Sequence, residues 1–488
     1  EIASCLVGSE MCIRDRSTTM HFMPGCEILQ SFDLVHWEHA TYVYETLDHT
    51  DAQQLKSGQN IYGQGMWAAS LRYHEGRFYI CFVANDTRKT YLYTSEKIDG
   101  PWKKQLIEGF YHDGSLLFDE DGRNYIVYGN DEIWITELNE DLTAPKKDGL
   151  HRLLVSDHKN PELGYEGSHI QKINGYYYIF LIHSLRDRWM RTEACFYSDS
   201  LEGEFTGGDV LCDDRGYCGQ GVAQGGIVDT PDGKWYAMLF QDSGAVGRLP
   251  ILLPVTWKDH FPVFGQNGHV PEEIEVHSTR PGYIYQPLVG SDDFCNGLLP
   301  RWQFNHDPDP RYYHLDALQG TYTITTREVC TELTQAVNTL TQRMSYPSCA
   351  AEVTVDASAL KEGDVAGLCA LQGCYAAVGI TKHHGKYEVL MLDKKEDGIL
   401  DMTEGTVVES HQMDFRLEAD FCNMKDEARC YYRVNKGDWL PIGTVHKLYF
   451  KLDHFTGCRF GLFCYAAEEK GGSACFRDFK YYDVDEIS

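Results

Sequence analysis

The stretch Pro161-Glu162-Leu163-Gly164-Tyr165-Glu166-Gly167-Ser168-His169 leads directly into an apolar segment over residues 170–182, which the turn Asn174-Gly175 divides into a β-hairpin. Glu166 stands at the head of its first strand, between an aromatic ring and a glycine. Because Gly167 has no side chain, another group can approach the backbone there. Tyr165 and the strand should bury the carboxyl group and raise the pKa of Glu166. The alternative is a glutamate that only caps the strand entry.

Hairpins of the same kind recur along the chain. A turn that contains glycine and is followed by aromatic residues occurs four times, with its glycine at Gly76, Gly122, Gly175 and Gly233. The intervals of 46, 53 and 58 residues are about the length of a four-stranded propeller blade. A solenoid or a Greek-key sandwich also produces regular hairpins, but a β-propeller fits this spacing better.

A second region begins where the repeat stops, in the proline-containing stretch from Arg280 to Pro287. Residues 322–482 again read as short strands with few helix caps or helical stripes, which predicts a β-sandwich. We therefore predict an all-β chain with a β-propeller over residues 17–287 and a β-sandwich over residues 288–488. The clearest strand predictions in the second region are residues 351–355, 387–391, 447–452 and 460–463.

The first blade of the propeller is expected to be incomplete. Residues 31–37 match the outer half of a repeat, yet residues 1–16 contain neither a glycine turn with paired aromatics nor an alternating apolar pattern. No hairpin is therefore predicted in residues 1–16. Their string over residues 5–16 resembles a translated sequencing adaptor more than a native strand, so we interpret residues 1–16 as a non-native segment.

Composition narrows the classes of partner. Lys+Arg 44 against Asp+Glu 73 gives a net charge of −29, which disfavours nucleic acid and anionic membrane surfaces and leaves neutral carbohydrate open. No apolar run is long enough to span a bilayer. The 17 cysteines are scattered without a CxxC pair, which favours reduced thiols and a cytoplasmic location and argues against zinc. The N-terminus lacks a secretion signal pattern, and a homo-oligomer is left open.

Three polar residues stand some way ahead of a hairpin turn in successive repeats: Asp113, Glu166 and Gln224. The inner strands of a propeller line one central channel, so these side chains should converge. Two convergent carboxylates with separated pKa values are what glycoside hydrolysis requires. The alternative for Asp113 is an Asx-turn residue ahead of Gly114.

These residues resemble glycoside hydrolase family 43, whose β-xylosidases and α-L-arabinofuranosidases are five-bladed propellers. The propeller motifs that match are residues 112–122, 165–169, 225–236 and 247–248, and Trp67-Ala68-Ala69 is similar to the family's Trp-Ala-Pro. Residues 292–294, 302–306, 338–343 and 366–368 resemble the family's C-terminal concanavalin-like sandwich. The resemblance covers residues 17–488.

The resemblance implies a role for each predicted site residue. Glu166 is the general acid, and Asp113 orients it and modulates its pKa. The implied substrate-binding residues are Trp67, Phe22, Arg248 and Gln224, with the two aromatic rings as walls of the sugar subsite. The alternative for the two rings is ordinary core packing. A loop of the sandwich is expected to reach the pocket around Trp67 and make the enzyme exo-acting.

The general base is the main departure from the family. Family members carry it in an Asp-Pro motif on the first inner strand, and no Asp-Pro precedes residue 160. The nearby carboxylates Glu1, Glu10 and Asp15 stand in other contexts, so the base is predicted to be absent from this chain. Gln224 stands where the family commonly has a histidine near a channel calcium ion, so we predict no metal and no cofactor.

The functional prediction is an exo-acting, inverting glycoside hydrolase that releases xylose or arabinose from short xylan or arabinoxylan oligosaccharides and is weakened by the missing base. Inversion implies that acid and base lie about 6.5–9.5 Å apart with a water between them. One alternative is a non-catalytic carbohydrate-binding propeller. Another is a purely structural propeller that binds a protein partner, which would not need Glu166, Asp113 and Arg248 in one channel.

Overall fold

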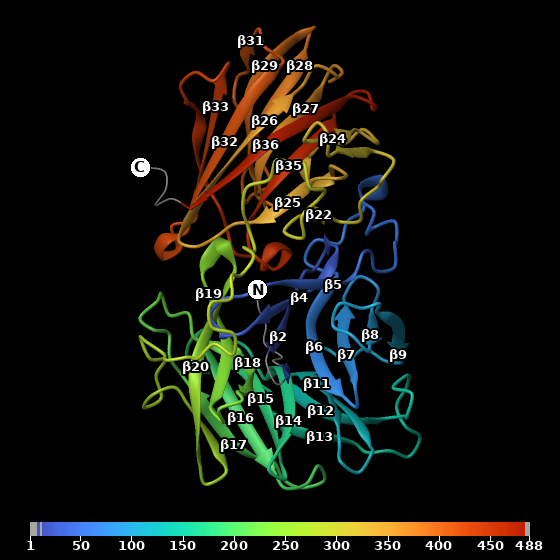
Figure 1. Cartoon of the computed structure of the whole chain (residues 1–488), viewed down its shortest axis with the longest axis vertical. Coiled ribbons are helices and arrows are strands. Elements are labelled where there is room, and N and C mark those ends of the chain that lie inside the picture. The colour runs from blue at the N-terminus through green and yellow to red at the C-terminus, as the bar shows by residue number, and fades with distance from the viewer. Residues whose placement is uncertain (1–6, 10–11, 484–488) are drawn as a thin grey trace.

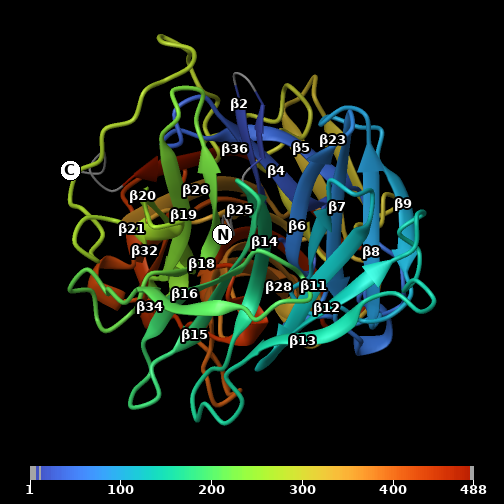
Figure 2. The ribbon, with the colours of Figure 1, turned by 90° about the horizontal axis from the view of Figure 1, so that it is seen from below.

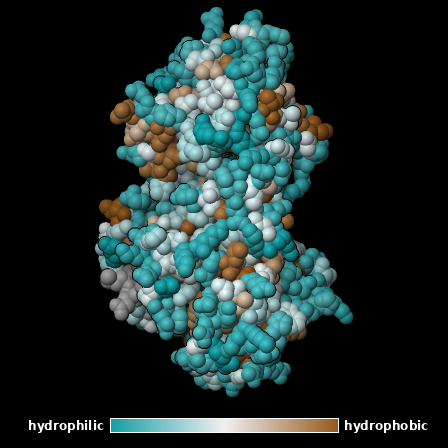
Figure 3. Space-filling view, turned by 90° about the vertical axis from the view of Figure 1, so that its right-hand side faces the viewer, coloured by the Kyte–Doolittle hydropathy of each residue, from teal (hydrophilic) through white to brown (hydrophobic). Residues whose placement is uncertain are grey.

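The computed structural model describes residues 7–9 and 12–483, which form two stacked all-β domains (Figure 1). The only helices among these residues are five single-turn 3-10 helices, η1 (Lys56–Gly58), η2 (Gly244–Val246), η3 (Leu333–Gln335), η4 (Cys422–Met424) and η5 (Leu452–His454). None of the helices in the described ranges is long and apolar enough to cross a membrane. The face shown in Figure 3 is mostly hydrophilic, with hydrophobic residues in small separate patches.

The propeller consists of five four-stranded antiparallel sheets arranged around a common centre (Figure 2). In each sheet the strands follow one another in chain order from the inner to the outer edge. The first blade is β1 (Val7–Ser9), β2 (Cys12–Ser17), β4 (Gly25–Ser31) and β5 (Glu38–Tyr44), and the second is β6 (Met66–His74), β7 (Arg77–Ala84), β8 (Lys89–Ser95) and β9 (Lys103–Ile107). The third is β10 (Ser115–Phe118), β11 (Asn124–Asn130), β12 (Glu132–Leu138) and β13 (His151–Ser156). The fourth is β14 (Glu166–Ile173), β15 (Tyr176–Ser184), β16 (Arg191–Ser198) and β17 (Thr206–Leu211), and the fifth is β18 (Ala223–Asp229), β19 (Trp235–Asp242), β20 (Arg248–Lys258) and β21 (Phe261–Phe264).

The four repeated glycines are the turns of the inner hairpins of the second to fifth blades. Gly76, Gly122, Gly175 and Gly233 have φ angles of +80°, +81°, +85° and +78°. Glycine adopts this left-handed region without the strain that a Cβ atom causes, which suits a tight turn between two strands. The repeat in the sequence therefore corresponds to one hairpin per blade.

The first blade differs from the expectation of no hairpin in residues 1–16. There β1 pairs with β2, with Val7 opposite Arg14 and Gly8 opposite Ile13, so the prediction of no hairpin is wrong. With β1, the first blade is a four-stranded sheet like the other four, although it was expected to be incomplete. The candidate bases Glu1 and Glu10 lie outside the described residues.

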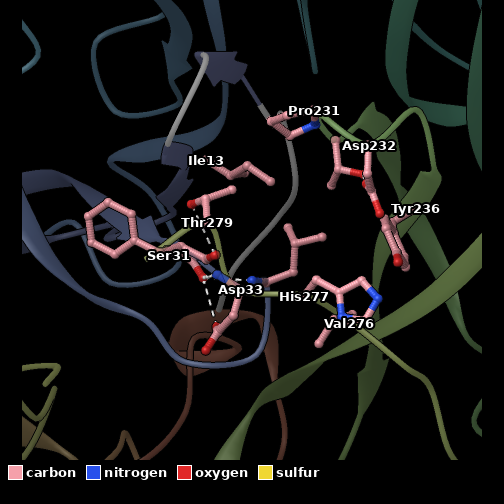
Figure 4. A pocket seen from close by; sticks show the side chains of 12 residues that line it. Ile13, Ser31, Asp33, Pro231, Asp232, Tyr236, Val276, His277 and Thr279 are labelled. Atoms are coloured by element: carbon pink, nitrogen blue, oxygen red, sulfur yellow. Dashed lines mark hydrogen bonds between the residues drawn. The ribbon is translucent and has the colours of Figure 1, made fainter. Parts of the chain in front are cut away.

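Apolar packing closes the ring of blades between the first and the fifth. Ile13, Leu29 and Trp37 of the first blade pack against Tyr236 and Met238 of the fifth. A small pocket of about 20 Å³ lies at this seam (Figure 4), with room for about one water molecule. The seam is therefore a packed boundary and not a ligand site.

The second domain is a sandwich of two sheets whose facing side chains form one core. One sheet has the order β3 (Phe22–Met23), β22 (Gln303–Asn305), β25 (Leu340–Arg343), β35 (Arg459–Ala466), β27 (Asp364–Leu371), β28 (Ala376–His383), β29 (Lys386–Lys394) and β30 (Leu400–Met402), and β31 (Thr406–Val408) pairs with β29. The other has the order β23 (Tyr313–Asp316), β24 (Thr321–Thr325), β36 (Ser473–Asp483), β26 (Ser348–Asp356), β32 (Gln412–Asp420), β33 (Glu427–Val434) and β34 (Leu440–Lys447). Strand β3 belongs to the propeller segment of the chain, so the first domain contributes an edge strand to the second.

The segment predicted as a strand over residues 447–452 is a loop. Strand β34 ends at Lys447, and the chain continues without strand structure to η5. Leu448 turns into the sandwich core, whereas Phe450 and Leu452 line a pocket at the propeller. The apolar residues of this segment are buried in two different places, the sandwich core and the pocket, and do not lie on one face of a sheet. Their spacing resembles that of a strand, which explains the wrong prediction.

Candidate active site

A pocket of about 360 Å³ lies where the channel of the propeller meets the sandwich. It is lined by five of the six predicted site residues, namely Trp67, Asp113, Glu166, Gln224 and Arg248. They come from β6, from the residues ahead of β10, and from β14, β18 and β20, which represent four different blades. The fold therefore brings together residues that lie far apart in the sequence, while their catalytic roles stay predictions.

Phe22 is the predicted residue that the fold places elsewhere. It is fully buried among residues of the sandwich and is not among the lining residues of the pocket. The guanidinium carbon of Arg459 lies 3.6 Å from the centroid of its ring. Because β3 pairs with β22, the Phe22 ring points into the core between the domains, and its expected place in the sugar subsite is wrong.

Three of the inner strands carry a β-bulge at the pocket end. The register shifts occur between Trp67 and Ser70 in β6, after Glu166 in β14 and after Ala223 in β18. A bulge bends a strand locally and changes the direction of the neighbouring side chain. This repeated feature explains how strands of one blade type present Trp67, Glu166 and Gln224 to a single pocket.

Gly167 occupies the bulge of β14 with a φ angle of +66°. A Cβ atom at this position would lie 2.5 Å from Nε2 of Gln224. The close approach that the sequence predicts at this glycine is thus made by the Gln224 side chain of the neighbouring blade. Any larger residue would push Gln224 out of the pocket wall.

Asp113 is tied to the segment that carries Glu166. The backbone N–H of Gly167 donates a hydrogen bond to Oδ2 of Asp113 at 3.1 Å, and the hydroxyl of Ser168 donates to the Asp113 carbonyl oxygen at 2.7 Å. The carboxylate therefore accepts a hydrogen bond from the next blade, which favours a site role over the Asx-turn alternative. Asp113 has a φ angle of +48°, in the left-handed region that aspartate adopts more readily than most residues.

His112 is a pocket residue to which the sequence analysis gave no role. Its Nε2 atom lies 3.8 Å from Oδ2 of Asp113 and 3.9 Å from Oε2 of Glu166. The charge of Asp113, followed by contacts with Glu166, raises the pKa of His112 to about 9, so the ring is protonated at neutral pH. The sequence signal that could have identified His112 was its position directly before Asp113, a predicted catalytic residue.

The pKa of Glu166 differs from the expected rise. Burial raises this pKa, but the hydrogen bond and charge of His112 and the charges of Arg191 and Arg248 outweigh burial and hold it below its ordinary value. Burial and the charge of Glu166 instead raise the pKa of Asp113.

Two arginines are fixed at the side of the pocket. Nη2 of Arg191 and Nε of Arg248 each lie 3.2 Å from an oxygen of Asp242. The guanidinium of Arg248 also lies between two rings, 4.3 Å from the centroid of Phe240 and 4.6 Å from that of Phe455. Such fixed guanidinium groups can donate hydrogen bonds to sugar hydroxyl groups without first being ordered.

The sandwich forms the remaining wall of the pocket through Phe450, Lys451, Leu452 and Phe455. The Phe455 ring meets Trp67 edge to face, with 5.4 Å between the centroids. The prediction that a residue after Asp293 contacts the pocket around Trp67 is confirmed. The sequence did not indicate which residue, because this segment reads as a strand.

The carboxylates of the pocket are too close to form an acid and base pair for inversion. One donor atom from each of His112, Asp113 and Glu166 lies within 4.8 Å of the others, so this group could also share a cation. An inverting pair needs about 6.5–9.5 Å between its carboxyl groups. No third carboxylate is found among the described residues that line the pocket, and Asp15 is fully buried outside it.

Comparisons with known proteins agree with this geometry. The sequence profile described as Glycosyl hydrolases family 43 matches residues 14–262, and that of the Beta xylosidase C-terminal Concanavalin A-like domain matches residues 291–482. A Beta-xylosidase of Formosa agariphila is 25% identical over 96% of this chain and 85% of its own length. A Non-reducing end alpha-L-arabinofuranosidase of Bacteroides ovatus is 24% identical over 65% of this chain and 61% of its own.

A solved structure agrees over nearly the whole chain. A protein of Bacteroides eggerthii, described as a bifunctional GH43-CE protein, superposes with a TM-score of 0.90 and 40% identity over 99% of this chain. The chain spans 63% of the length of that protein. With both profiles, the fold and the pocket in agreement, this chain belongs to glycosyl hydrolase family 43 and is a glycosidase of the group that contains β-xylosidases and arabinofuranosidases.

Proposed function

We propose that the chain is an exo-acting, inverting glycoside hydrolase that removes terminal xylose or arabinose from short xylan or arabinoxylan oligosaccharides. The observation that carries this proposal is the convergence of Glu166, Asp113 and Arg248 in one pocket that Phe455 of the sandwich closes on one side. A pocket that is closed on one side accommodates the end of an oligosaccharide better than its middle. The named relatives, a β-xylosidase and an arabinofuranosidase, support a pentose substrate.

Each group has a role in the proposed reaction. Glu166 donates a proton to the leaving oxygen, and Asp113 holds the Glu166 segment through Gly167 and Ser168. Arg191 and Arg248 orient the sugar. A water must attack from the opposite face, and the described lining offers no third carboxylate to activate it, so turnover is slowed by about 10²–10⁴-fold.

The test is to replace residues 1–16 with a segment that carries Asp-Pro and a glycine-aromatic hairpin. Hydrolysis of nitrophenyl xyloside or nitrophenyl arabinofuranoside should then rise by about two orders of magnitude or more. Equal rates for the original and the replaced chain would show that the base lies elsewhere and would overturn this part of the proposal.

The second candidate is a sugar-binding propeller without catalysis. The observation that favours it is the lowered pKa of Glu166, which leaves the acid ionised in the free protein. An aryl glycoside needs little help from an acid, so measurable turnover of nitrophenyl glycosides by the unaltered chain favours the enzyme. Binding of xylobiose without any turnover, even after residues 1–16 are replaced, favours the binding protein.

A further inference from the structure

A second cavity, of about 480 Å³, lies between the propeller and the sandwich beside the catalytic pocket. We call it the interdomain chamber and define it by Glu27, Arg248, Arg301, Gln303 and Arg343, which are among its lining residues. Arg248 lines both cavities, so the chamber and the catalytic pocket share a wall. Its volume is within the range of small-molecule sites.

Arg301 is the cation of the chamber with the least compensation. Within the described residues its guanidinium has no hydrogen bond or ion pair, and its Nη1 atom lies so close to Gly290 that a Cβ atom there would overlap it. Gly290 is itself held by two hydrogen bonds with the Gln342 side chain, each of 3.0 Å. Partial burial lowers the pKa of Arg301, and the charge of Asp292 acts in the opposite direction.

The carboxylate of Glu27 is already engaged. Nη2 of Arg343 lies 3.4 Å from Oε2 of Glu27, and Nδ1 of His39 lies 3.2 Å from Oε1. Glu27 is the only Asp or Glu among the described residues that line the chamber. It therefore compensates Arg343, and the negative charge that acts on Arg301 comes from Asp292, which lies outside the chamber lining.

A further buried cation lies behind the chamber wall. Arg459 is 1% exposed, and its Nη1 atom donates a hydrogen bond of 2.8 Å to Gln303, a lining residue. Its Nε and Nη2 atoms have no hydrogen-bond partner in the part of the chain that the structure describes. Glu27 acts on Arg459 as well as on Arg343, so one carboxylate serves two buried cations, and a bound anion would compensate the remaining positive charge.

We propose that the interdomain chamber binds the carboxylate of a uronic acid, carried by the oligosaccharide whose terminal sugar enters the catalytic pocket. Arg301 offers the planar pair of N–H donors that recognises a carboxylate with two parallel hydrogen bonds. The chain as a whole has a net charge of −29, so overall composition does not produce this local positive charge. The link to a substrate rests on the proposed function, whereas binding in the chamber does not.

Binding is measured by titration calorimetry of the full chain with D-glucuronate and with D-glucuronamide, its neutral analogue. Glucuronate should bind at least about tenfold more tightly than glucuronamide, and Arg301→Gln should remove this preference. Arg311→Gln is the matched control, because Arg311 is 75% exposed, lies outside the chamber and pairs with Asp309. Thermal unfolding of both variants verifies that they are folded.

Equal binding of the two ligands, or an unchanged preference in Arg301→Gln, would overturn the site. Acetate or phosphate that displaces glucuronate at equal concentration would overturn the uronic acid assignment in favour of a general anion site. Calorimetry needs no turnover, so a failure of the proposed catalytic function leaves these readouts intact. The substrate link is tested separately, since a xylo-oligosaccharide with a glucuronic acid branch should bind more tightly than a neutral one of equal length, and equal affinities would overturn that link.

Discussion

The first and the fourth blades use the same four-stranded sheet for different purposes. The fourth blade has an inner strand of eight residues whose bulge presents Glu166 to the pocket. In the first blade, the segment after β2 contributes only Thr18 to the described lining of the pocket and then continues into β3, which joins a sheet of the sandwich. One copy of the repeat therefore serves chemistry and the other serves attachment of the second domain.

The largest expected effect belongs to the fourth blade. In the chain with residues 1–16 replaced, Glu166→Gln should reduce hydrolysis of xylobiose by about 10²–10⁴-fold, because the amide cannot protonate the leaving oxygen. Initial rates at saturating and at low substrate concentration measure the loss. A rate within tenfold of the parent would remove Glu166 from the role of acid.

The stability that comes from the contact between the first blade and the sandwich should fall at acidic pH. His21, His306 and His454 are buried together between the domains, with 4.9 Å between the ring centroids of His21 and His306 and 5.2 Å between those of His21 and His454. Burial lowers the pKa of His306 to about 3 and holds that of His21 well below 6.5. The folded protein therefore keeps both rings neutral at pH values where the unfolded chain is protonated.

The sign of the effect follows from these lowered pKa values. Stability from the neutral rings is fully present above about pH 6.5 and is lost as the pH falls toward 3, by about 1.4 kcal/mol per pH unit for each ring. Urea unfolding should thus show a loss of about 2 kcal/mol per ring between pH 7 and pH 5. His306→Gln should flatten this dependence, whereas His158→Gln, at an exposed position, should leave it unchanged. A slope that is the same in all three proteins would contradict the prediction.

A smaller effect is expected from Gly167→Ala in the bulge of the fourth blade. The new Cβ atom would displace Gln224 and occupy a left-handed conformation, at a cost of about 1–2 kcal/mol. Gly175→Ala is the matched control, because this turn glycine has a φ angle of +85° and no atom within 4 Å of an added Cβ. Thermal unfolding should show a loss in both variants, and turnover should fall only in Gly167→Ala.

The smallest effect is expected from a substitution of Asp15, the one carboxylate in the described part of β2. Asp15 is fully buried outside the pocket, and its Oδ1 atom accepts a hydrogen bond from the backbone N–H of Arg16. Asp15→Asn should change the rate on nitrophenyl glycosides by no more than about twofold, because a side chain outside the pocket cannot act as the general base. Loss of a general base would typically cost about 10²–10⁴-fold. A loss of two orders of magnitude would identify Asp15 as the missing base and make the first blade a catalytic one.

The sequence predicts what local chemistry determines. Each inner hairpin from the second to the fifth blade has its own glycine turn, and the regular recurrence of these turns was enough to predict the propeller and the meeting of Asp113, Glu166 and Gln224. Features that depend on distant pairing were not predictable. The side chain of Phe22 points into the sandwich only because β3 meets β22, almost three hundred residues along the chain.

Electrostatics was the other part that could not be predicted. The apolar hairpin around Glu166 indicates burial, and burial alone raises a carboxyl pKa. The charges that reverse this effect come from His112, Arg191 and Arg248, which three other strands or loops supply. Their distances from Glu166 exist only in the folded chain.

The pairing of β3 with β22 affects how this protein could be cut or recombined. Among the described strands, β3 pairs with β22, which follows Trp302. An isolated catalytic half would keep β3 with an unpaired edge, while an isolated sandwich would expose the backbone of β22. Bare strand edges promote aggregation. A chimaera that exchanges one half for that of a relative must therefore transfer residues 22–23 together with the sandwich, although they lie about 280 positions ahead of it in the chain. The boundary that matters for recombination is thus drawn in space and does not coincide with any single point in the sequence.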